Sequence, residues 1–446
     1  MITAIVTSDN HLGVYYARLR PDRLEERRRS LQRAFERVVD AALERRANLF
    51  LHAGDLFDRP DPRNAERLFV ARQMRRLGEA NIPIFAITGN HDSPRSYGYD
   101  GGIAPQEELA ALDAIHLFRN SHEVQSRMVE IQGQRVCIWG MSSDFNRPLD
   151  VCPLEDTVKE HQREGDINIG LLHYGVEGWA RADVQEPTLS LENLDKLQAD
   201  ALCIGHLHER QQKRLPGGAV LLNPGGTEHI HFGEEKLECG FWILSMEPGH
   251  VEAEYVPLPT QPMRTLRIDL TDWPAPPGPL SPAWGEGERS ESEMGLAKDT
   301  EEDPQPEFNS SPVANGDSPL SPSWGEGPGV RAAIEEVSDP SQLLRVRLSG
   351  RVPRERFQEI DLAAIQAEAN ERNFYCQLET AELTVYDHAE DLLIGYGVSF
   401  DAGAELKHQM QCVLENYSDD AAEQEICHLA GQHLEMTYDR LTKGAR

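Results

Sequence analysis

The chain has 446 residues, 39% of them hydrophobic, and a formal net charge of −31, a length that predicts two or three domains. No run of 18 or more apolar residues occurs, and the N-terminal "MITAIVTSDNH" has neither a basic start nor a long apolar stretch, so we expect neither a membrane-spanning helix nor a secretory signal. The seven scattered cysteines favour a reducing cytoplasm over a disulfide framework or a cysteine zinc site.

Residues 1–245 alternate short apolar runs with helical patterns. The strand-like runs lie at 2–7, 48–53, 82–88, 134–141, 168–173 and 200–205. Between the first two runs, apolar residues from Leu24 to Ala42 recur near a 3.6-residue period, and a less regular helical pattern runs from Ala65 to Leu77. Strands that alternate with helices predict βαβ units and a sheet covered on both faces, so this part is an α/β domain.

Residues 274–331 differ in composition from the rest of the chain. They are rich in Pro, Gly, Ser and Glu and contain the near-repeat "PLSPAWGEG" and "PLSPSWGEG". Such a composition buries too little apolar surface to fold, so we predict a disordered insertion. The alternative is a recruitment motif in which Trp284 and Trp324 anchor a partner.

The insertion interrupts a small predicted α+β domain, residues 263–273 plus 332–398. Its expected elements are strands at 263–270, 343–350 and 374–387 and a helix at 353–370. The tail, 399–446, is expected to form two helices, and its apolar residues from Leu406 to Tyr417 share one helical face. These helices either pack on the small domain or present an apolar stripe to a partner.

Polar side chains follow five of the strand-like runs at the point where each run ends. They form the groups Asp9-Asn10-His11, Gly54-Asp55, Gly89-Asn90-His91-Asp92, His173 and Gly205-His206-Leu207-His208. Taken singly, the first three groups could be ordinary turns or helix caps, whereas Gly-His-Leu-His alone is a moderately specific metal signal. Because the carboxyl ends of parallel strands meet at one edge of a sheet, all five together predict a single site.

The chemistry of this set predicts a divalent metal centre. Oxygen and nitrogen donors without thiolate suit hard to borderline cations. One ion takes about four protein ligands, and the set offers more, so two ions that share a carboxylate are expected. Asp55 follows the most central of these strands and is the expected bridge. Glycines before Asp55, Asn90 and His206 permit tight turns out of the strands.

These segments resemble a known family. "DNHLG" (9–13), "GDLFD" (54–58), "GNHD" (89–92), "LLH" (171–173) and "GHLH" (205–208) are similar to the signature of calcineurin-like metallophosphoesterases. The first two motifs and the arginine-bearing first helix further resemble SbcD-type DNA-repair exonucleases, including the YhaO-like branch. The resemblance covers the predicted domain 1–262. It implies an α/β metallophosphoesterase sandwich, in which helices flank β-sheets, followed by a small capping domain and C-terminal helices.

The resemblance also implies roles for individual residues. The implied ligands of one metal are Asp9, His11, Asp55 and His208. Those of the second metal are Asp55, Asn90, His173 and His206. His91 would protonate the leaving oxygen, and Asp92 would orient His91. Manganese (Mn²⁺) suits this family, while iron, zinc and magnesium stay open.

The implied function is a DNA exonuclease or endonuclease in DNA repair. Two metal ions would activate a bridging hydroxide that attacks the phosphodiester, with His91 as proton donor. The resemblance further implies a homodimer and an SbcC-like coiled-coil ATPase as the partner of the C-terminal helices. The alternative enzyme is a phosphodiesterase or phosphatase acting on nucleotides or other small phosphoesters. A scaffold with a degenerate site is the third possibility, which the intact ligand set argues against.

Other segments give weaker signals for DNA contact. The strongly acidic total argues against nucleic acid, but residues 17–46 are rich in arginine, so either a DNA-facing patch or a solvated helix face is open there. Arg95, Tyr97 and Tyr99 are candidates for phosphate contact or base stacking. His52 is expected to be a core histidine that supports the site, and His229 and His231 are expected to be loop residues.

Overall fold

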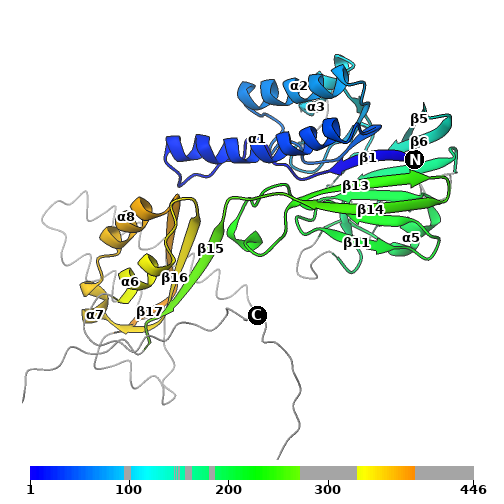
Figure 1. Ribbon diagram of the computed structural model, residues 1–446. Coiled ribbons are helices and arrows are strands. Elements are labelled where there is room, and N and C mark those ends of the chain that lie inside the picture. The colour runs from blue at the N-terminus through cyan, green and yellow to red at the C-terminus, as the bar shows by residue number, and fades with distance from the viewer. Residues whose placement is uncertain are drawn as a thin grey trace, which may run out of the picture. The chain divides into compact units, whose positions relative to one another are not determined.

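Two six-stranded sheets face each other in the computed structural model (Figure 1). The structure describes residues 1–94, 102–144, 146, 148, 151–155, 163–179, 186–271 and 329–386. The first sheet has the order β14 (His250–Pro257), β13 (Gly240–Glu247), β1 (Ile2–Thr7), β2 (Leu49–Ala53), β3 (Ile84–Ile87) and β4 (His116–Leu117).

The second sheet is built in the same way, with parallel strands at its centre. Its order is β11 (Gln211–Arg214), β12 (Val220–Asn223), β10 (Ala201–Gly205), β7 (Ile167–His173), β6 (Gln134–Gly140) and β5 (Gln125–Ile131). The strands that end in the polar motifs run parallel to one another within each sheet. They are β1, β2 and β3 in the first sheet and β7 and β10 in the second. Their carboxyl ends therefore lie along one edge of each sheet.

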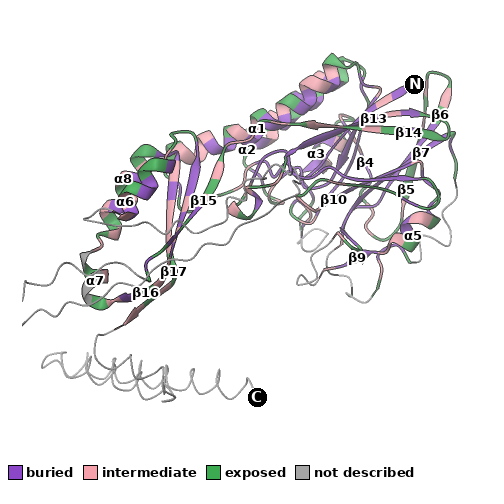
Figure 2. Cartoon of the chain, turned by 60° about the horizontal axis from the view of Figure 1, so that its bottom comes forward, coloured by how far each residue is buried: buried purple, intermediate pink, exposed green. Residues whose placement is uncertain are grey.

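Three clusters of buried apolar side chains hold the sheets and helices together, and Figure 2 shows buried residues along the strands. Alternation along β1 shows how the clusters form, because Ile5 packs toward the helices while Ile2, Ala4 and Val6 lie between the sheets. The helices are α1 (Pro21–Glu44), α2 (Asn64–Glu79), α3 (Gln106–Ala111) and α5 (Leu191–Lys196). A large apolar side chain contributes about 1.5–3 kcal/mol when fully buried, so this packing fixes the strand ends.

The predicted α/β fold is confirmed. The six expected strand runs correspond to β1, β2, β3, β6, β7 and β10, and the two expected helices to α1 and α2. The sequence analysis missed the antiparallel strands β5, β11, β13 and β14 and the parallel strand β12. A two-stranded sheet of β8 (Gly175–Val176) and β9 (Thr188–Leu189) was also missed.

A three-stranded sheet follows, formed by β15 (Met263–Asp269), β16 (Leu343–Pro353) and β17 (Tyr375–Tyr386). The boundary between the two compact units of the chain crosses all three strands, after Ile268, Leu348 and Ala381.

The helices near this sheet differ from the sequence-based expectation. A single helix at 353–370 is wrong: α7 (Arg354–Glu359) and α8 (Leu362–Arg372) are separate, because the backbone of Ile360 is extended, with φ −86° and ψ 103°. Helix α6 (Gly329–Val337), which was not expected, starts within the last three residues of the segment 274–331 and buries Val330 and Ile334.

Several sequence-based predictions lie outside the described residues. They concern residues 274–328 of the insertion, the loop that carries Arg95, Tyr97 and Tyr99, and the tail 399–446. Among the residues that the structure does describe, no helix is both long and apolar enough to cross a membrane.

Candidate metal centre

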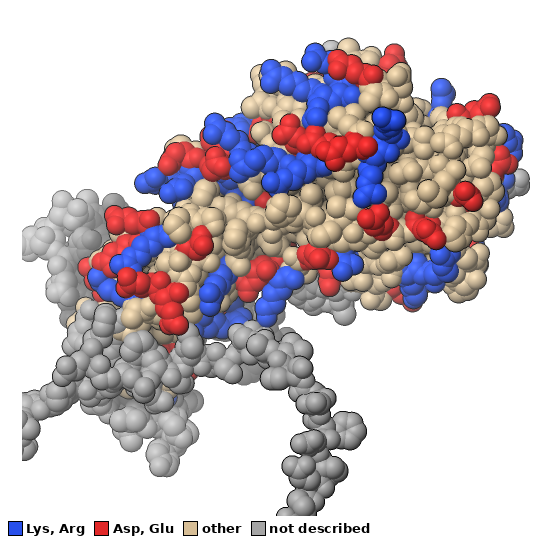
Figure 3. All heavy atoms as spheres, in the orientation of Figure 1, with Lys and Arg blue, Asp and Glu red and all other residues tan. Residues whose placement is uncertain are grey.

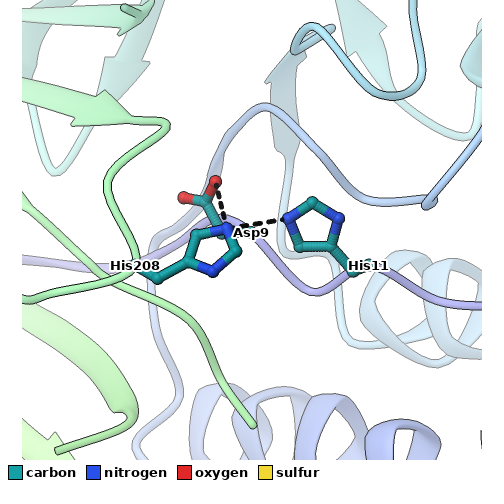
Figure 4. A group of neighbouring side chains, drawn as sticks. All are labelled: Asp9, His11 and His208. Carbon is teal, nitrogen blue, oxygen red and sulfur yellow. Dashed lines mark hydrogen bonds and ion pairs between the residues drawn. The ribbon is translucent and has the colours of Figure 1, made fainter. Parts of the chain in front are cut away.

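The first group of donors comes from the loops after β1 and β10. The Nε2 atoms of His11 and His208 lie 3.1 Å apart, and His208 Nε2 lies 4.0 Å from Asp9 Oδ1 (Figure 4). The ligand atoms of these three residues all lie within 4.8 Å of one another. This group contains three of the four residues that the sequence assigned to the first metal.

The second group of donors surrounds the side-chain amide of Asn90. His173 Nε2 lies 3.0 Å from Asn90 Oδ1 and 3.2 Å from Asp55 Oδ2. His206 Nδ1 lies 3.1 Å from the same Asn90 oxygen. The four residues that the sequence assigned to the second metal are therefore neighbours in space.

Asp55 lies between the two groups. Its Oδ2 atom is 3.2 Å from His173 Nε2 and 3.8 Å from His11 Nε2, so one carboxylate oxygen faces both groups. Its other oxygen, Oδ1, accepts a hydrogen bond of 2.8 Å from the backbone N–H of His91. This is the position that a bridging carboxylate requires.

The loops that carry these ligands have an unusual backbone. Asp9, His11, Asp55 and His206 have φ values of 50°, 45°, 55° and 102°, a region that costs a non-glycine residue about 1–3 kcal/mol. Hydrogen bonds hold the loop after β1 against the loop after β2, because the N–H groups of Asn10 and His11 both donate to the carbonyl of Asp55. Strain that is held in place in this way concentrates at functional sites.

The two sheets meet at the site through His173. This side chain is fully buried at the end of β7, and its Nδ1 lies 2.8 Å from the carbonyl oxygen of Ala53 at the end of β2. Since the carbonyl can only accept, Nδ1 carries a proton, and Nε2 is the nitrogen that faces Asp55 and Asn90. An imidazole held in this orientation binds a metal through Nε2 once that nitrogen has lost its proton.

The buried carboxylates of the site are stabilised by nearby positive charge. Burial alone would raise the pKa of Asp55, but His173 and the other imidazoles hold it well below its usual range. Burial lowers the pKa of His173 and His208, yet Asp55 raises the first to about 9 and Glu234 the second to about 8. Two buried aspartates among imidazole and amide donors fit divalent cations, which supply the charge that protons would otherwise supply.

The structure places Asp58 against the ring of His91. His91 Nδ1 lies 3.3 Å from the backbone oxygen of Asp58 and 3.8 Å from its Oδ1. Asp58 Oδ1 also lies 3.4 Å from Nδ1 of His11. Burial lowers the pKa of His91, and the charges of Asp55 and Asp58 oppose this effect.

Asp92, the expected partner of His91, has a different set of contacts. Its buried carboxylate accepts hydrogen bonds from the backbone N–H groups of Leu56 and Gly89, both at 2.8 Å, and from the side chain of Gln106. Burial raises the pKa of Asp92 to about 7. These contacts join the loop after β3 to the loop after β2 and so hold the loop that carries Asn90 and His91.

Three acidic residues at the site were not singled out from the sequence. They are Asp58, Glu186 and Glu234, and each contacts a histidine of the site. The motif "GDLFD" ends in Asp58 and contained that signal. Glu186 and Glu234 belong to loops without any motif, so no local pattern pointed to them.

His52, His229 and His231, the other histidines considered in the sequence analysis, each have a polar contact. His52 Nε2 lies 2.7 Å from Asn10 Oδ1, and burial lowers the pKa of His52 to about 3, so the ring is neutral. His229 Nε2 lies 2.9 Å from the carbonyl oxygen of Leu237. His231 is a loop residue, as expected, and its Nε2 lies 2.9 Å from Glu234 Oε1.

The arginines of α1 are largely matched by carboxylates. Arg27 is fully buried and lies 3.4 Å from Glu228. At the surface, Arg33 pairs with Glu26 at 2.9 Å, as one of several such pairs. Figure 3 shows Lys and Arg interleaved with Asp and Glu on this side of the molecule. This pattern favours a solvated, internally paired helix face over a bare basic patch.

Comparison with known proteins identifies relatives of this architecture. A family model described as calcineurin-like phosphoesterase matches residues 2–210. The chain is similar to the DNA double-strand break repair protein Mre11 of Saccharolobus solfataricus, with 30% identity over 60% of this chain and 67% of the relative. Mre11 of Sulfolobus acidocaldarius is 28% identical over 52% of this chain and 55% of its own.

A bacterial relative is the uncharacterized metallophosphoesterase YhaO of Bacillus subtilis, which is 28% identical over 49% of this chain and 50% of its own. The chain spans about half the length of several of the curated relatives it matches. The family match at residues 2–210 lies within the two-sheet part of the molecule.

Proposed function

The chain belongs to the calcineurin-like phosphoesterase family, and from that premise we propose that it is a dinuclear-metal phosphodiesterase that cleaves DNA. One observation carries the proposal. Two groups of metal-binding atoms, centred on His11 with His208 and on Asn90 with His173, face the same Asp55 carboxylate, with His91 beside them.

These contacts support the ligand assignment that the family resemblance implies. One cation would be held by Asp9, His11 and His208, the other by Asn90, His173 and His206, and both by Asp55. Bound divalent cations supply positive charge for the developing phosphoryl oxyanion and lower the pKa of water at the site.

The residues of the chain supply the rest of the chemistry. His91 donates a proton to the leaving oxygen as the phosphoester bond breaks. Its Nδ1 side faces Asp58, which leaves Nε2 as the donor nitrogen, and the Asp58 carboxylate stabilises the charge of the protonated ring. Asp92 keeps the His91 loop in place through backbone hydrogen bonds.

DNA as the substrate is supported by the relatives, several of which are named as DNA double-strand break repair proteins. DNA repair as the setting has the same support. From the family resemblance of the motifs and the cysteine pattern we further propose manganese as the metal, a homodimer and a cytoplasmic location. An SbcC-like coiled-coil ATPase is the proposed partner of residues 399–446, which lie outside the described part of the chain.

A second substrate class has an observation in its favour. The chain carries a net charge of −31, and the arginines of α1 are paired with carboxylates. A polyanion such as DNA is bound mainly through unmatched Lys and Arg. Nucleotides or other small phosphoesters need fewer such contacts and are the alternative substrates.

The test is a Mn²⁺-dependent cleavage assay on single- and double-stranded DNA, with a chromogenic phosphodiester assayed in parallel. We expect the wild-type protein to cut DNA and His91→Ala to lower kcat by about 10²–10⁴-fold, the usual contribution of a general acid. The control is His250→Ala, which changes an exposed histidine of β14. Hydrolysis of the small diester without DNA cleavage would overturn the nuclease proposal in favour of small phosphoesters.

A further inference from the structure

The two histidines of the "GHLH" motif each contact a carboxylate on the side of the ring that faces away from the site. His208 Nδ1 lies 2.5 Å from Glu234 Oε1, and His206 Nε2 lies 2.6 Å from Glu186 Oε2. We propose that Glu234 and Glu186 are positioning residues, each of which fixes one histidine for one of the two metal ions. This inference rests on the dinuclear site of the proposed function.

Glu234 is held rigidly in the short 3-10 helix η1 (Phe232–Glu234). Its side chain is only 4% exposed, and its Oε2 accepts a hydrogen bond of 2.6 Å from the backbone N–H of Ile230. Its Oε1 also faces Nε2 of His231 at 2.9 Å. The Nδ1 of His231 accepts from the N–H of Gly233, so Nε2 of His231 carries the proton and donates to Glu234.

Glu186 reaches His206 from a different part of the chain, just before β9. Its side chain is 11% exposed and that of His206 is 15% exposed, so their contact is largely shielded from water. The hydroxyl of Thr188 donates to the backbone carbonyl of Glu186 at 3.1 Å. The two carboxylates therefore come from independent loops and serve histidines only two positions apart.

The carboxylates engage opposite ring nitrogens. A carboxylate accepts a hydrogen bond, so Nδ1 of His208 carries a proton, and Nε2 is the nitrogen that faces Asp9 and His11 and would bind a metal in its deprotonated form. His206 carries its proton on Nε2 and directs Nδ1 at Asn90. One short motif therefore faces both proposed metal positions, His208 toward His11 and His206 toward Asn90.

The histidines His173 and His11 are held in other ways. His173 is fixed by the carbonyl oxygen of Ala53, which no substitution removes, and His11 Nδ1 lies 3.4 Å from Asp58. A hydrogen-bonded partner of this kind orients a metal ligand and raises its basicity, and its loss lowers metal affinity by about 10–100-fold. Glu234 and Glu186 are thus the places where this effect can be tested one ion at a time.

The experiment is a calorimetric titration of the metal-free full-length chain with Mn²⁺, without DNA. Glu234→Met removes the acceptor at similar size, and Glu186→Met does the same for His206. We expect each variant to bind one of two ions about 10–100-fold more weakly and the other with wild-type affinity. Glu234→Gln and Glu186→Gln keep an oxygen acceptor, so they should recover most of the lost affinity, which a merely space-filling role does not predict.

Ligand variants identify which ion is affected. In the His11→Ala background, which removes the first ion, Glu186→Met should weaken the remaining ion and Glu234→Met should leave it unchanged. In the Asn90→Ala background, which removes the second ion, Glu234→Met should weaken the remaining ion and Glu186→Met should leave it unchanged. Glu238→Met and Glu192→Met, at side chains that are 51% and 78% exposed, are the matched controls and should bind both ions normally.

Three results would overturn the inference: wild-type affinity for both ions in the two Met variants, one variant that weakens both ions, or losses that Gln does not recover. Cleavage of DNA by the wild-type protein is measured separately. A chain that shows the expected metal-binding pattern but cuts no DNA sustains the inference and overturns the nuclease proposal. If the wild-type chain cuts DNA while both Met variants bind Mn²⁺ with wild-type affinity, the nuclease proposal is sustained and the inference about Glu234 and Glu186 is overturned.

Discussion

At the scale of single residues, the contacts of Asp58 and Asp92 are the main difference from the sequence-based assignment. Asp58 faces Nδ1 of both His91 and His11, whereas Asp92 accepts hydrogen bonds from backbone N–H groups of two loops. The family resemblance implied that Asp92 orients His91. Spatial adjacency assigns that contact to Asp58, since a residue next in the chain points its side chain elsewhere.

Changing Asp58 to Asn should lower kcat by about 10²-fold or more, because the charge that stabilises protonated His91 is lost. Metal affinity should fall less, since the amide that replaces the carboxylate still offers an oxygen to His11. The measurements are steady-state kinetics and a Mn²⁺ titration, with Asp61→Asn in the same loop, at an exposed residue, as the control. If Asp92→Asn instead lowered kcat with metal affinity and Tm unchanged, the sequence-based assignment of Asp92 would be right.

At the scale of elements, the ends of the strands decide the geometry of the site. The loop after β3 passes so close to the loop after β2 that a Cβ on Gly89 would overlap the carboxylate of Asp55. The sequence predicted that a glycine was needed before Asn90 for a tight turn. The tertiary structure supplies another reason, which is the close approach of a neighbouring loop.

We therefore expect Gly89→Ala to displace the Asp55 carboxylate and to weaken the binding of both ions, which a Mn²⁺ titration would detect. Gly78→Ala in α2 is the matched control, because a Cβ there meets no atom within 4 Å. That variant should keep metal binding and gain roughly 0.5–1 kcal/mol in stability from the higher helix propensity of alanine. Normal Mn²⁺ affinity in Gly89→Ala would contradict the close approach.

At the scale of the whole molecule, the acidic composition and the insertion are the features least connected to the site. The segment 274–331 was predicted from composition alone, but α6 begins at Gly329 and buries Val330 with 2% exposure. The boundary of a removable segment therefore lies before Gly329. A periodic pattern could not mark this helix, since it spans only Gly329–Val337 and adjoins a Pro- and Gly-rich stretch.

Replacing 274–328 by a short Gly/Ser linker should leave Mn²⁺ affinity and Tm unchanged. Replacing 274–331 should also leave Mn²⁺ affinity unchanged but lower Tm, because it removes Val330 and about 1.5–3 kcal/mol of apolar burial. Thermal unfolding and metal titration of both variants provide the test. Loss of metal binding on removal of 274–328 would show that the insertion contributes to the site.

The order of residues along the chain was enough to establish the α/β class, the central strands and the residue types at five strand ends. Periodicity and strand-end position are local properties of the chain, so they can be recognised in the amino-acid sequence. Residues such as Asp9, Asp55 and His208 could therefore be predicted as metal ligands from sequence alone.

The pairing of each carboxylate oxygen with a particular imidazole nitrogen was decided only by the tertiary structure. Asp58, Glu186 and Glu234 contact the histidines of the site from loops far apart in sequence. Such contacts depend on how two sheets pack and how their loops cross, which no local pattern encodes. The same packing places a carboxylate at Nε2 of His206 and at Nδ1 of His208. Which ring nitrogen of each histidine in "GHLH" faces the site is therefore set by the tertiary structure and not by the motif itself.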